Sequence, residues 1–326
     1  MKRRKFITLL GGAAAWPLAA RAQQPAMPVI GFLHPGSPEA EANNLALFRQ
    51  GLSETGYAEG RNIAIEYRWG RNDNGRLPEM ATDLVRRRVT LIAAPGSSGA
   101  ALAAKVATST IPIVFSTGDD PVEIGLVASL NRPDGNITGF TSMNVELMGK
   151  RLGLLHELLP GAERYAVLFN PNLSSTKSLI AIMRPAASAI GRQVETFEAA
   201  TPRDIETAFA RMVQKRTDAL LVSSGAPFID RRVQLSTLAT YHKLPAIYTA
   251  RSYAEAGGLM SYGSPGEEQF RQAGIYTGRV LKGEKPADLP VIRATKFEFI
   301  INLQTARVLS VDVPATLLAR ADEVIE

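Results

Sequence analysis

The strongest constraint on the fold lies in residues 89–121, where a strand, a Gly/Ser turn, a helix of small residues and a second strand follow one another. The apolar run at 90–94 is short and stops at a Pro-Gly-Ser-Ser-Gly turn, which is typical of a buried parallel strand that leads into a helix. The second strand, 112–115, ends in the polar and acidic turn 116–121. Because open α/β sheets bind ligands at the carboxyl ends of their strands, these two turns predict a binding site.

This alternation of strands and helices occurs throughout the chain and restarts once. In the first half we predict strands at 29–33, 63–68, 90–94, 112–115 and 136–140, with helices at 39–55, 77–88, 100–107 and 122–130. After a helix at 145–159 we predict strands at 165–169, 193–198, 219–222, 245–248 and 258–261, with helices at 176–190, 203–215 and 230–241. Such alternation predicts an α/β protein with two doubly wound, parallel-sheet lobes.

The C-terminal part predicts three crossings between the lobes. A helix at 267–281 follows the second sheet, 286–290 has the composition of a linker, and a strand at 297–301 precedes helical turns at 303–309 and 315–321. We therefore assign residues 28–141 and 264–288 to an N-terminal lobe, and residues 142–263 and 289–326 to a C-terminal lobe. A three-strand hinge is expected to join them. With 326 residues in total, each lobe is large enough to bury its own core.

Residues 1–22 predict an export signal, with a basic start, an apolar stretch and a cleavage site near Ala22. The pair Arg3 and Arg4 fits a twin-arginine leader, and an ordinary secretory signal is the alternative. The apolar stretch is too short to span a bilayer, so we expect a periplasmic protein without stable membrane insertion. Five of the 37 basic residues lie in this leader, which leaves 32 basic residues against 31 acidic ones. A nearly neutral protein is not expected to bind nucleic acid.

The chain contains no cysteine and only three histidines. It therefore has no disulfide, thiolate metal site or cysteine nucleophile. The turn at 96–99 misses the spacing of a nucleophile elbow, and neither a dinucleotide fingerprint nor a zinc-protease motif is present. We predict no catalytic residue, cofactor or metal. A secreted α/β enzyme that acts on a small polar substrate is the alternative.

Five ordered stretches carry a resemblance to a known family: residues 120–139, 164–172, 244–263, 281–291 and 296–309. They are similar to the ABC-transporter substrate-binding protein family, in the branch associated with tryptophan and tyrosine uptake. The resemblance implies the type I periplasmic-binding-protein fold, a small-molecule solute as ligand and ABC permease subunits as partners; we expect a monomer. Asp134 stands where the family usually has a second glycine, and the lipoprotein cysteine of many relatives is missing.

Candidate ligand contacts in the N-terminal lobe follow its strands. The hydroxyls of Ser97 and Ser98 and the backbone amides of their turn are suited to a ligand carboxylate at a helix N-terminus, although either serine is also a good helix cap. Thr117 and Asp119 follow the next strand; Asp119 is assigned to a ligand ammonium, whereas Asp120 is expected to cap a helix that begins at Pro121. His34 follows the first strand and is expected to line the mouth of the site.

Hydroxyl and amide side chains also follow the strands of the second lobe: Asn170, Ser174, Ser175, Ser223 and Ser224. They suit a zwitterion, and each is equally ordinary in a turn. Arg251 is predicted either to clamp a carboxylate or to be a solvated surface charge. Tyr262 and Tyr253 are predicted either to stack on an aromatic ligand or to pack near the hinge. We expect a receptor that closes on a small solute, such as an aromatic or branched amino acid or a related small acid, and delivers it to an ABC permease.

Overall fold

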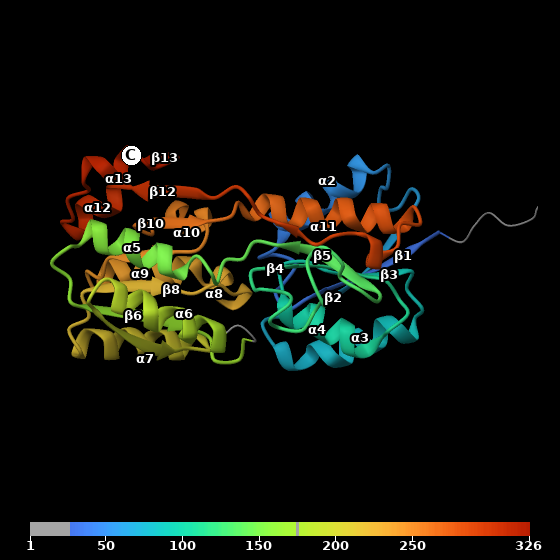
Figure 1. Cartoon of the computed structure of the whole chain (residues 1–326), viewed down its shortest axis with the longest axis horizontal. Coiled ribbons are helices and arrows are strands. Elements are labelled where there is room, and N and C mark those ends of the chain that lie inside the picture. The colour runs from blue at the N-terminus through green and yellow to red at the C-terminus, as the bar shows by residue number, and fades with distance from the viewer. Residues whose placement is uncertain (1–26, 174–175) are drawn as a thin grey trace, which may run out of the picture.

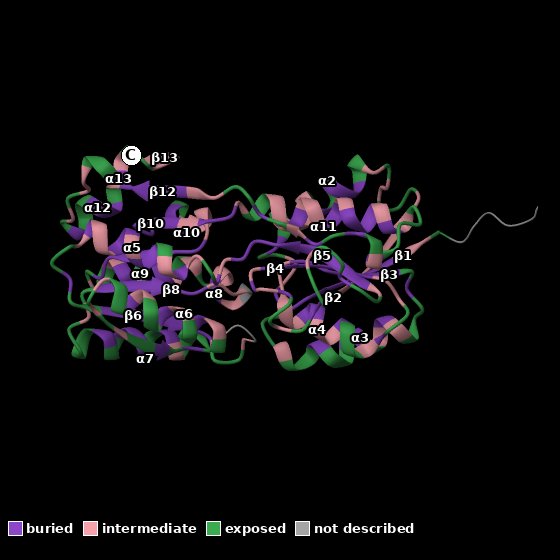
Figure 2. Ribbon diagram, in the orientation of Figure 1, coloured by how far each residue is buried: buried purple, intermediate pink, exposed green. Residues whose placement is uncertain are grey.

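The computed structural model describes residues 27–173 and 176–326, so the predicted export signal lies outside the described residues. Two lobes lie next to each other along the long axis of the molecule (Figure 1). Each has one central sheet with helices on both faces, and buried residues concentrate in the two sheets (Figure 2). The prediction of an α/β protein with two parallel-sheet lobes is confirmed.

The sheet of the N-terminal lobe has the strand order β11-β5-β4-β3-β1-β2, and all of its pairs are parallel. Its strands are β1 (Val29–His34), β2 (Ala64–Trp69), β3 (Leu91–Ala94), β4 (Ile113–Thr117), β5 (Ile137–Thr141) and β11 (Ile292–Arg293). Its helical elements are α2 (Ala42–Glu54), η1 (Asn74–Arg76), α3 (Leu77–Arg86), α4 (Ser98–Ala107), α11 (Gly266–Leu281) and η2 (Pro286–Asp288). One core cluster lies under α3 and α4, and a second contains Phe48 of α2 and Phe270 of α11.

The sheet of the C-terminal lobe has the order β13-β12-β10-β9-β8-β6-β7. Its strands are β6 (Arg164–Phe169), β7 (Gln193–Glu198), β8 (Ala219–Val222), β9 (Ala246–Tyr248), β10 (Met260–Gly263), β12 (Glu298–Asn302) and β13 (Glu323–Ile325). Its helices are α5 (Met148–Leu158), α6 (Thr176–Ala189), α7 (Pro202–Gln214), α8 (Ala226–Asp230), α9 (Arg232–Tyr241), α10 (Arg251–Glu255), α12 (Leu303–Leu309) and α13 (Ala315–Leu318). Leu155 and Met183 belong to the core on one face of the sheet, and Phe209 and Leu235 to the core on the other.

The chain passes between the lobes after β5, after β10 and after β11 (Figure 1). The third passage differs from the predicted boundary at residue 288, because Ile292 pairs with Phe140 and thereby places β11 in the first sheet. β12 then enters the second sheet antiparallel to β10. β12 begins at the side of the sheet that faces the first lobe, because the chain arrives from there. The parallel strands of the second sheet end at that side, so β12 runs in the opposite direction.

One further prediction of secondary structure is wrong, and another needs a change of bounds. Residues 122–130 form turns rather than a helix, because Gly125 has a positive φ of 73° and the amides of Leu126 and Val127 both donate to the carbonyl of Pro121. The helix predicted at 230–241 is present as α9, which begins at Arg232, and a short helix that was not predicted, α8, precedes it and ends at Asp230. The break between α8 and α9 places Asp230 at the end of α8, where it faces the first lobe.

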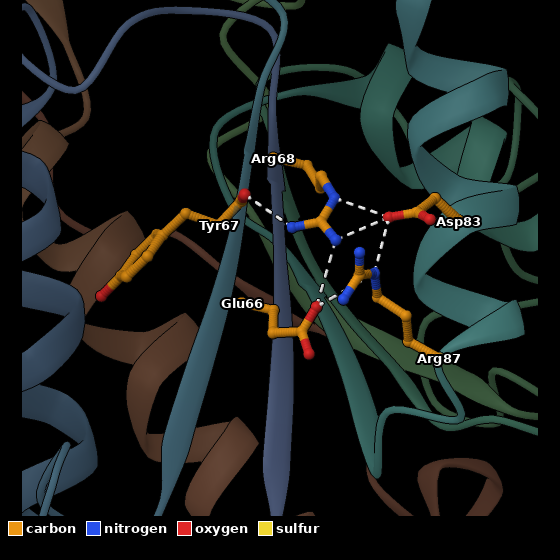
Figure 3. A network of polar contacts seen from close by, with 5 residues as sticks. All are labelled: Glu66, Tyr67, Arg68, Asp83 and Arg87. Carbon is orange, nitrogen blue, oxygen red and sulfur yellow. Dashed lines mark hydrogen bonds and ion pairs between the residues drawn. The ribbon is translucent and has the colours of Figure 1, made fainter.

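The outer edge of the first sheet is attached to α3 by a polar network (Figure 3). The guanidinium of Arg68 on β2 donates to Asp83 of α3 at 2.6 Å and to Glu66 at 3.1 Å. Arg87 pairs with the same two carboxylates. Arg68 and Arg87 hold the pKa of the Asp83 carboxyl below its ordinary value. This network lies on the solvent side of the lobe and is structural.

Candidate functional site

The carboxyl ends of strands from both sheets point toward the space between the lobes. A cavity of about 280 Å³ lies there and is lined from both sides, by Asp119 and Glu123 of the first lobe, by Glu146 of the first crossing, and by Ser178 and Ile182 of α6. The Ser178 hydroxyl donates to the Glu123 carboxylate at 2.6 Å, so the lobes touch at the rim of the cavity. Among the described residues, Asp119 is the one predicted ligand contact that lines this cavity.

The hydroxyls of the Gly96–Gly99 turn are engaged within their own lobe. Ser97 is the N-cap of α4 and accepts from the amide of Ala100 at 3.2 Å. Ser98 donates to the Asp119 carboxylate at 2.6 Å and shares a short hydrogen bond with Thr117. Asp119, which is 6% exposed, donates its own amide to Thr117 at 3.0 Å. The predicted residues Ser98, Thr117 and Asp119 therefore form one buried cluster at the mouth of the first lobe.

Asp120 caps a turn instead of a helix, since its carboxylate accepts from the amides of Val122 and Glu123 at 2.8 and 3.3 Å. Asp120 thus acts as a cap, as the sequence predicts, although the helix that it was expected to cap does not form. Asp119 as a ligand contact stays a prediction.

His34 is 1% exposed and has a defined tautomer. The amide of Gly36 donates to its Nδ1 at 3.0 Å, which places the ring proton on Nε2. Burial lowers the pKa of His34 to about 4, and the nearby charge of Asp230 opposes this only in part. The ring lies 5.5 Å from Trp69 and 6.1 Å from Phe270, so a neutral imidazole forms part of an aromatic wall at the end of β1.

The polar residues of the second lobe are placed at the ends of its strands. Asn170 is 3% exposed and accepts from the amide of Asn172 at 2.9 Å, which is ordinary turn chemistry. Ser223 is buried after β8, and Ser224 is half-buried. The predicted contacts Ser174 and Ser175 lie outside the described residues.

Arg251 begins α10 and gives its guanidinium to protein carboxylates. It donates to both oxygens of Glu323 at 2.7 Å and to Glu255 at 2.7 Å. Hydrogen bonds to these two acids raise its pKa above the ordinary value. A solute carboxylate would have to replace Glu323, so the clamp predicted at Arg251 stays a prediction that requires breaking a bidentate pair.

The tyrosines near the hinge pack against other rings. Tyr253 is fully buried and stacks on Tyr248 with a centroid distance of 4.6 Å, which is the packing alternative of its prediction. The ring of Tyr262 lies 6.2 Å from Phe297 and 6.3 Å from Phe299. Its role toward a ligand is untested.

Sequence reasoning missed two carboxylates between the lobes. Asp230 at the end of α8 interacts electrostatically with Glu41, His34 and Asn72 of the first lobe. Glu41 is only 3% exposed, and burial raises its pKa. Asp230 lies at the end of α8, beyond the turn that follows β8, and no local sequence pattern marks it.

Arg151 of α5 is a second omission. It is fully buried, and it donates to the Tyr262 carbonyl at 2.6 Å and to the Asn144 carbonyl at 2.8 Å. Asn144 lies in the first crossing and Tyr262 immediately before the second. One cation therefore connects two of the segments that join the lobes.

In the two described ranges, no group of three or more His, Asp or Glu side chains is arranged to hold a metal ion. None of the helices within those ranges has the length and apolar character needed to cross a membrane.

Comparison with known proteins identifies relatives over nearly the whole chain. Residues 36–325 match the profile of the family described as ABC transporter substrate binding protein. A "Tyrosine-binding protein" of Clostridioides difficile (strain R20291) is 30% identical over 276 residues, which is 85% of this chain and 78% of that protein.

Two solved structures, each 25% identical to the chain, are informative together. The ABC domain of Streptococcus pneumoniae in complex with L-Trp gives a TM-score of 0.83, with 91% of this chain and 99% of that chain covered. The ligand-free, open structure of a substrate binding protein with adhesive properties from Clostridium difficile gives 0.65, with 92% and 99% covered. The described fold is thus more similar to the liganded relative than to the open one.

Proposed function

The chain belongs to the ABC transporter substrate binding protein family, and from this premise we propose that it is an exported receptor for an aromatic amino acid. The family binds solutes for ABC transporters, and its members are typically found outside the cytoplasm. The prediction of a solute-binding protein of this family is confirmed. The identity of the solute, cleavage of a leader near Ala22, release into the periplasm and a monomeric state belong to the proposal.

The observation that carries the proposal is the cavity between the lobes. It is lined by residues that follow β4 and β5 of the first lobe and by residues of α6 in the second lobe. A solute held there contacts both lobes, so its binding energy favours the closed arrangement over the open one. The higher TM-score against the complex with L-Trp than against the open relative supports a closed arrangement in this structure.

The choice of an aromatic amino acid rests on the relatives. The aromatic cluster of His34, Trp69 and Phe270 packs at the end of β1 and does not line the cavity. The N-terminus of α4, which begins after Ser97, would receive the solute carboxylate, because the amides of a first helical turn lack partners inside the helix.

The test is a thermal-shift screen of the purified exported protein with L-tyrosine, L-tryptophan, branched amino acids, aromatic acids and sugars. We expect the two aromatic amino acids to raise the melting temperature most, since a ligand of the native state stabilises it by mass action. X-ray scattering should show a smaller radius of gyration for the protein saturated with the best ligand than for the free protein. Chemical consumption of the ligand would favour the enzyme alternative. An unchanged radius of gyration at saturation would refute closure on the solute.

A further inference from the structure

Asp230 is the feature that the function described so far does not use. Both of its carboxylate oxygens are buried, and neither accepts a hydrogen bond of good geometry from the described residues. The Asn72 side chain lies near enough to lower the pKa of Asp230, without satisfying either oxygen. A buried carboxylate without donors is costly, so an unmet need for a donor exists at this point of the fold.

The neighbours of Asp230 come mostly from the opposite lobe. Burial and the charge of Glu41 both raise the pKa of Asp230, whereas Asn72, His34 and Arg231 lower it. Arg231 acts through its charge alone, and Arg232 uses its guanidinium to donate to the carbonyl of Ile229 at 3.1 Å. The cations on the adjacent helix therefore do not fill the acceptor positions of Asp230.

Glu41 lies opposite, just before α2, and is 3% exposed. One of its oxygens accepts from the Asn44 amide at 2.7 Å. Burial raises the pKa of Glu41, and the hydrogen bond from Asn44 and the charge of Arg232 oppose the rise. Two carboxylates, one from each lobe, thus interact electrostatically and repel when both are ionised.

We propose that Asp230 and Glu41 together form a subsite for a cationic group of the solute, namely a primary ammonium. An ammonium has three N–H donors and no acceptor, which matches the two unsatisfied oxygens of Asp230, and the charge of Glu41 adds to the attraction. This inference rests on the proposed receptor function and adds the residues that read the charge of the solute.

The subsite also gives closure a physical cause. With the cleft empty, closing brings two like charges together in a poorly solvated place, which favours the open form. A cation between them reverses the sign of the interaction and touches both lobes at once. The solute then favours the closed form through a contact that the open form does not contain, as closure on binding requires.

Isothermal titration calorimetry with matched probes tests the subsite. The probes are L-tyrosine against 3-(4-hydroxyphenyl)propionate and L-tryptophan against 3-indolepropionate, which differ only in the ammonium group. We expect wild type to bind each amino acid about ten- to a hundredfold more tightly than its deaminated analogue, as lost hydrogen bonds to charged groups predict. Asp230→Asn and Glu41→Gln should each remove most of this preference and leave the affinity for the analogues nearly unchanged.

Asp134→Asn is the control, because Asp134 is an exposed residue in a turn and its carboxylate accepts a hydrogen bond from the amide of Gly135. It should bind all four probes as wild type does. The free Asp230→Asn protein should melt at the same temperature as wild type or higher, since the substitution removes a repulsion. A lower melting temperature with equal losses for both members of a pair would reveal a structural role and overturn the proposal.

The remaining outcomes distinguish the ammonium subsite from the receptor function. Equal affinity of wild type for an amino acid and its analogue, or an undiminished preference in Asp230→Asn, would refute the ammonium subsite while the receptor function stands. Absence of binding by all four probes would refute the proposed aromatic amino acid receptor, and the subsite with it.

Discussion

Replacement of Arg151 by methionine should destabilise the protein more than any loss of a surface charge. The guanidinium is 0% exposed and donates to the Tyr262 carbonyl at 2.6 Å, the Asn144 carbonyl at 2.8 Å and the Asn144 side-chain oxygen at 3.1 Å. Its fourth contact is the Met148 sulfur at 3.4 Å. Within the described residues no carboxylate pairs with it, so these carbonyl oxygens carry the stabilisation of a buried charge.

The size of the effect follows from two opposing contributions. Three hydrogen bonds from a charged donor, at about 1.5–3 kcal/mol each, are lost, and the acceptors are left in a buried place. The cost of burying the cation, several kcal/mol, is recovered at the same time. Because methionine fills much of the volume of the arginine stem, we expect a net loss of about 2–4 kcal/mol in the free energy of unfolding. For lobes of this size, that lowers the melting temperature by roughly 5–15 °C.

Urea unfolding and differential scanning calorimetry of the free protein measure this loss. Arg184→Met, on the exposed side of α6, is the matched control and should stay within about 0.5 kcal/mol of wild type. Arg151→Lys should recover part of the loss, because an ammonium cannot reach all the acceptors of a planar fork. Wild-type stability in Arg151→Met would show that desolvation of the cation cancels its hydrogen bonds, and the view of Arg151 as a connector of two crossings would be wrong.

Three further predictions concern stability alone. Gly274→Ala should lower the free energy of unfolding by about 2–3 kcal/mol, because the added Cβ would overlap the Phe48 carbonyl where α11 and α2 meet. Gly153→Ala in α5, which has open space around it, should raise the free energy of unfolding by about 0.5–1 kcal/mol, and equal urea midpoints for the two variants would contradict the packing argument. Burial lowers the pKa of His34 from 6.5 to about 4, so the unfolded chain binds more protons than the folded one between these pH values, and the free energy of unfolding should fall by about 3 kcal/mol from pH 6.5 to 4. A His34→Gln protein whose urea midpoint depends on pH in the same way as wild type would exclude His34 as the cause. Arg68→Ala should lower the free energy of unfolding by only about 0.5–1 kcal/mol, and by less in 1 M salt, because the Arg68 side chain is 20% exposed and its partners are 32% and 31% exposed. A loss that does not depend on salt would argue against a screened surface network.

Most of the fold could be predicted from local sequence patterns. Short apolar runs bounded by Gly, Ser and Asn located the strands, and the bounds predicted for 193–198 and 219–222 agree with those of β7 and β8. The failures are elements that depend on distant partners. β11 has two residues and β13 three, too few for any periodicity; β11 exists because it pairs with β5, far away in the chain, and β13 because it pairs with β12.

The turn residues of the site were predictable for the same local reason, but their chemistry was not. Ser97 and Asp120 satisfy amides of their own turns, and Ser98 and Asp119 satisfy each other. A polar residue after a strand is thus available to a ligand only if its own turn does not use it, and the sequence does not reveal which case holds.

Asp230 shows what decides that question. In the sequence it is one acid among the polar residues at the start of an expected helix, and nothing nearby marks it. Its importance comes from Glu41, His34 and Asn72, which precede it by more than 150 residues and reach it only when both lobes are folded and close together. A residue whose donors are missing from its own lobe is one that a solute between the lobes can satisfy, and this makes an unmet hydrogen bond across the cleft a better guide to the ligand than any hydroxyl-rich turn.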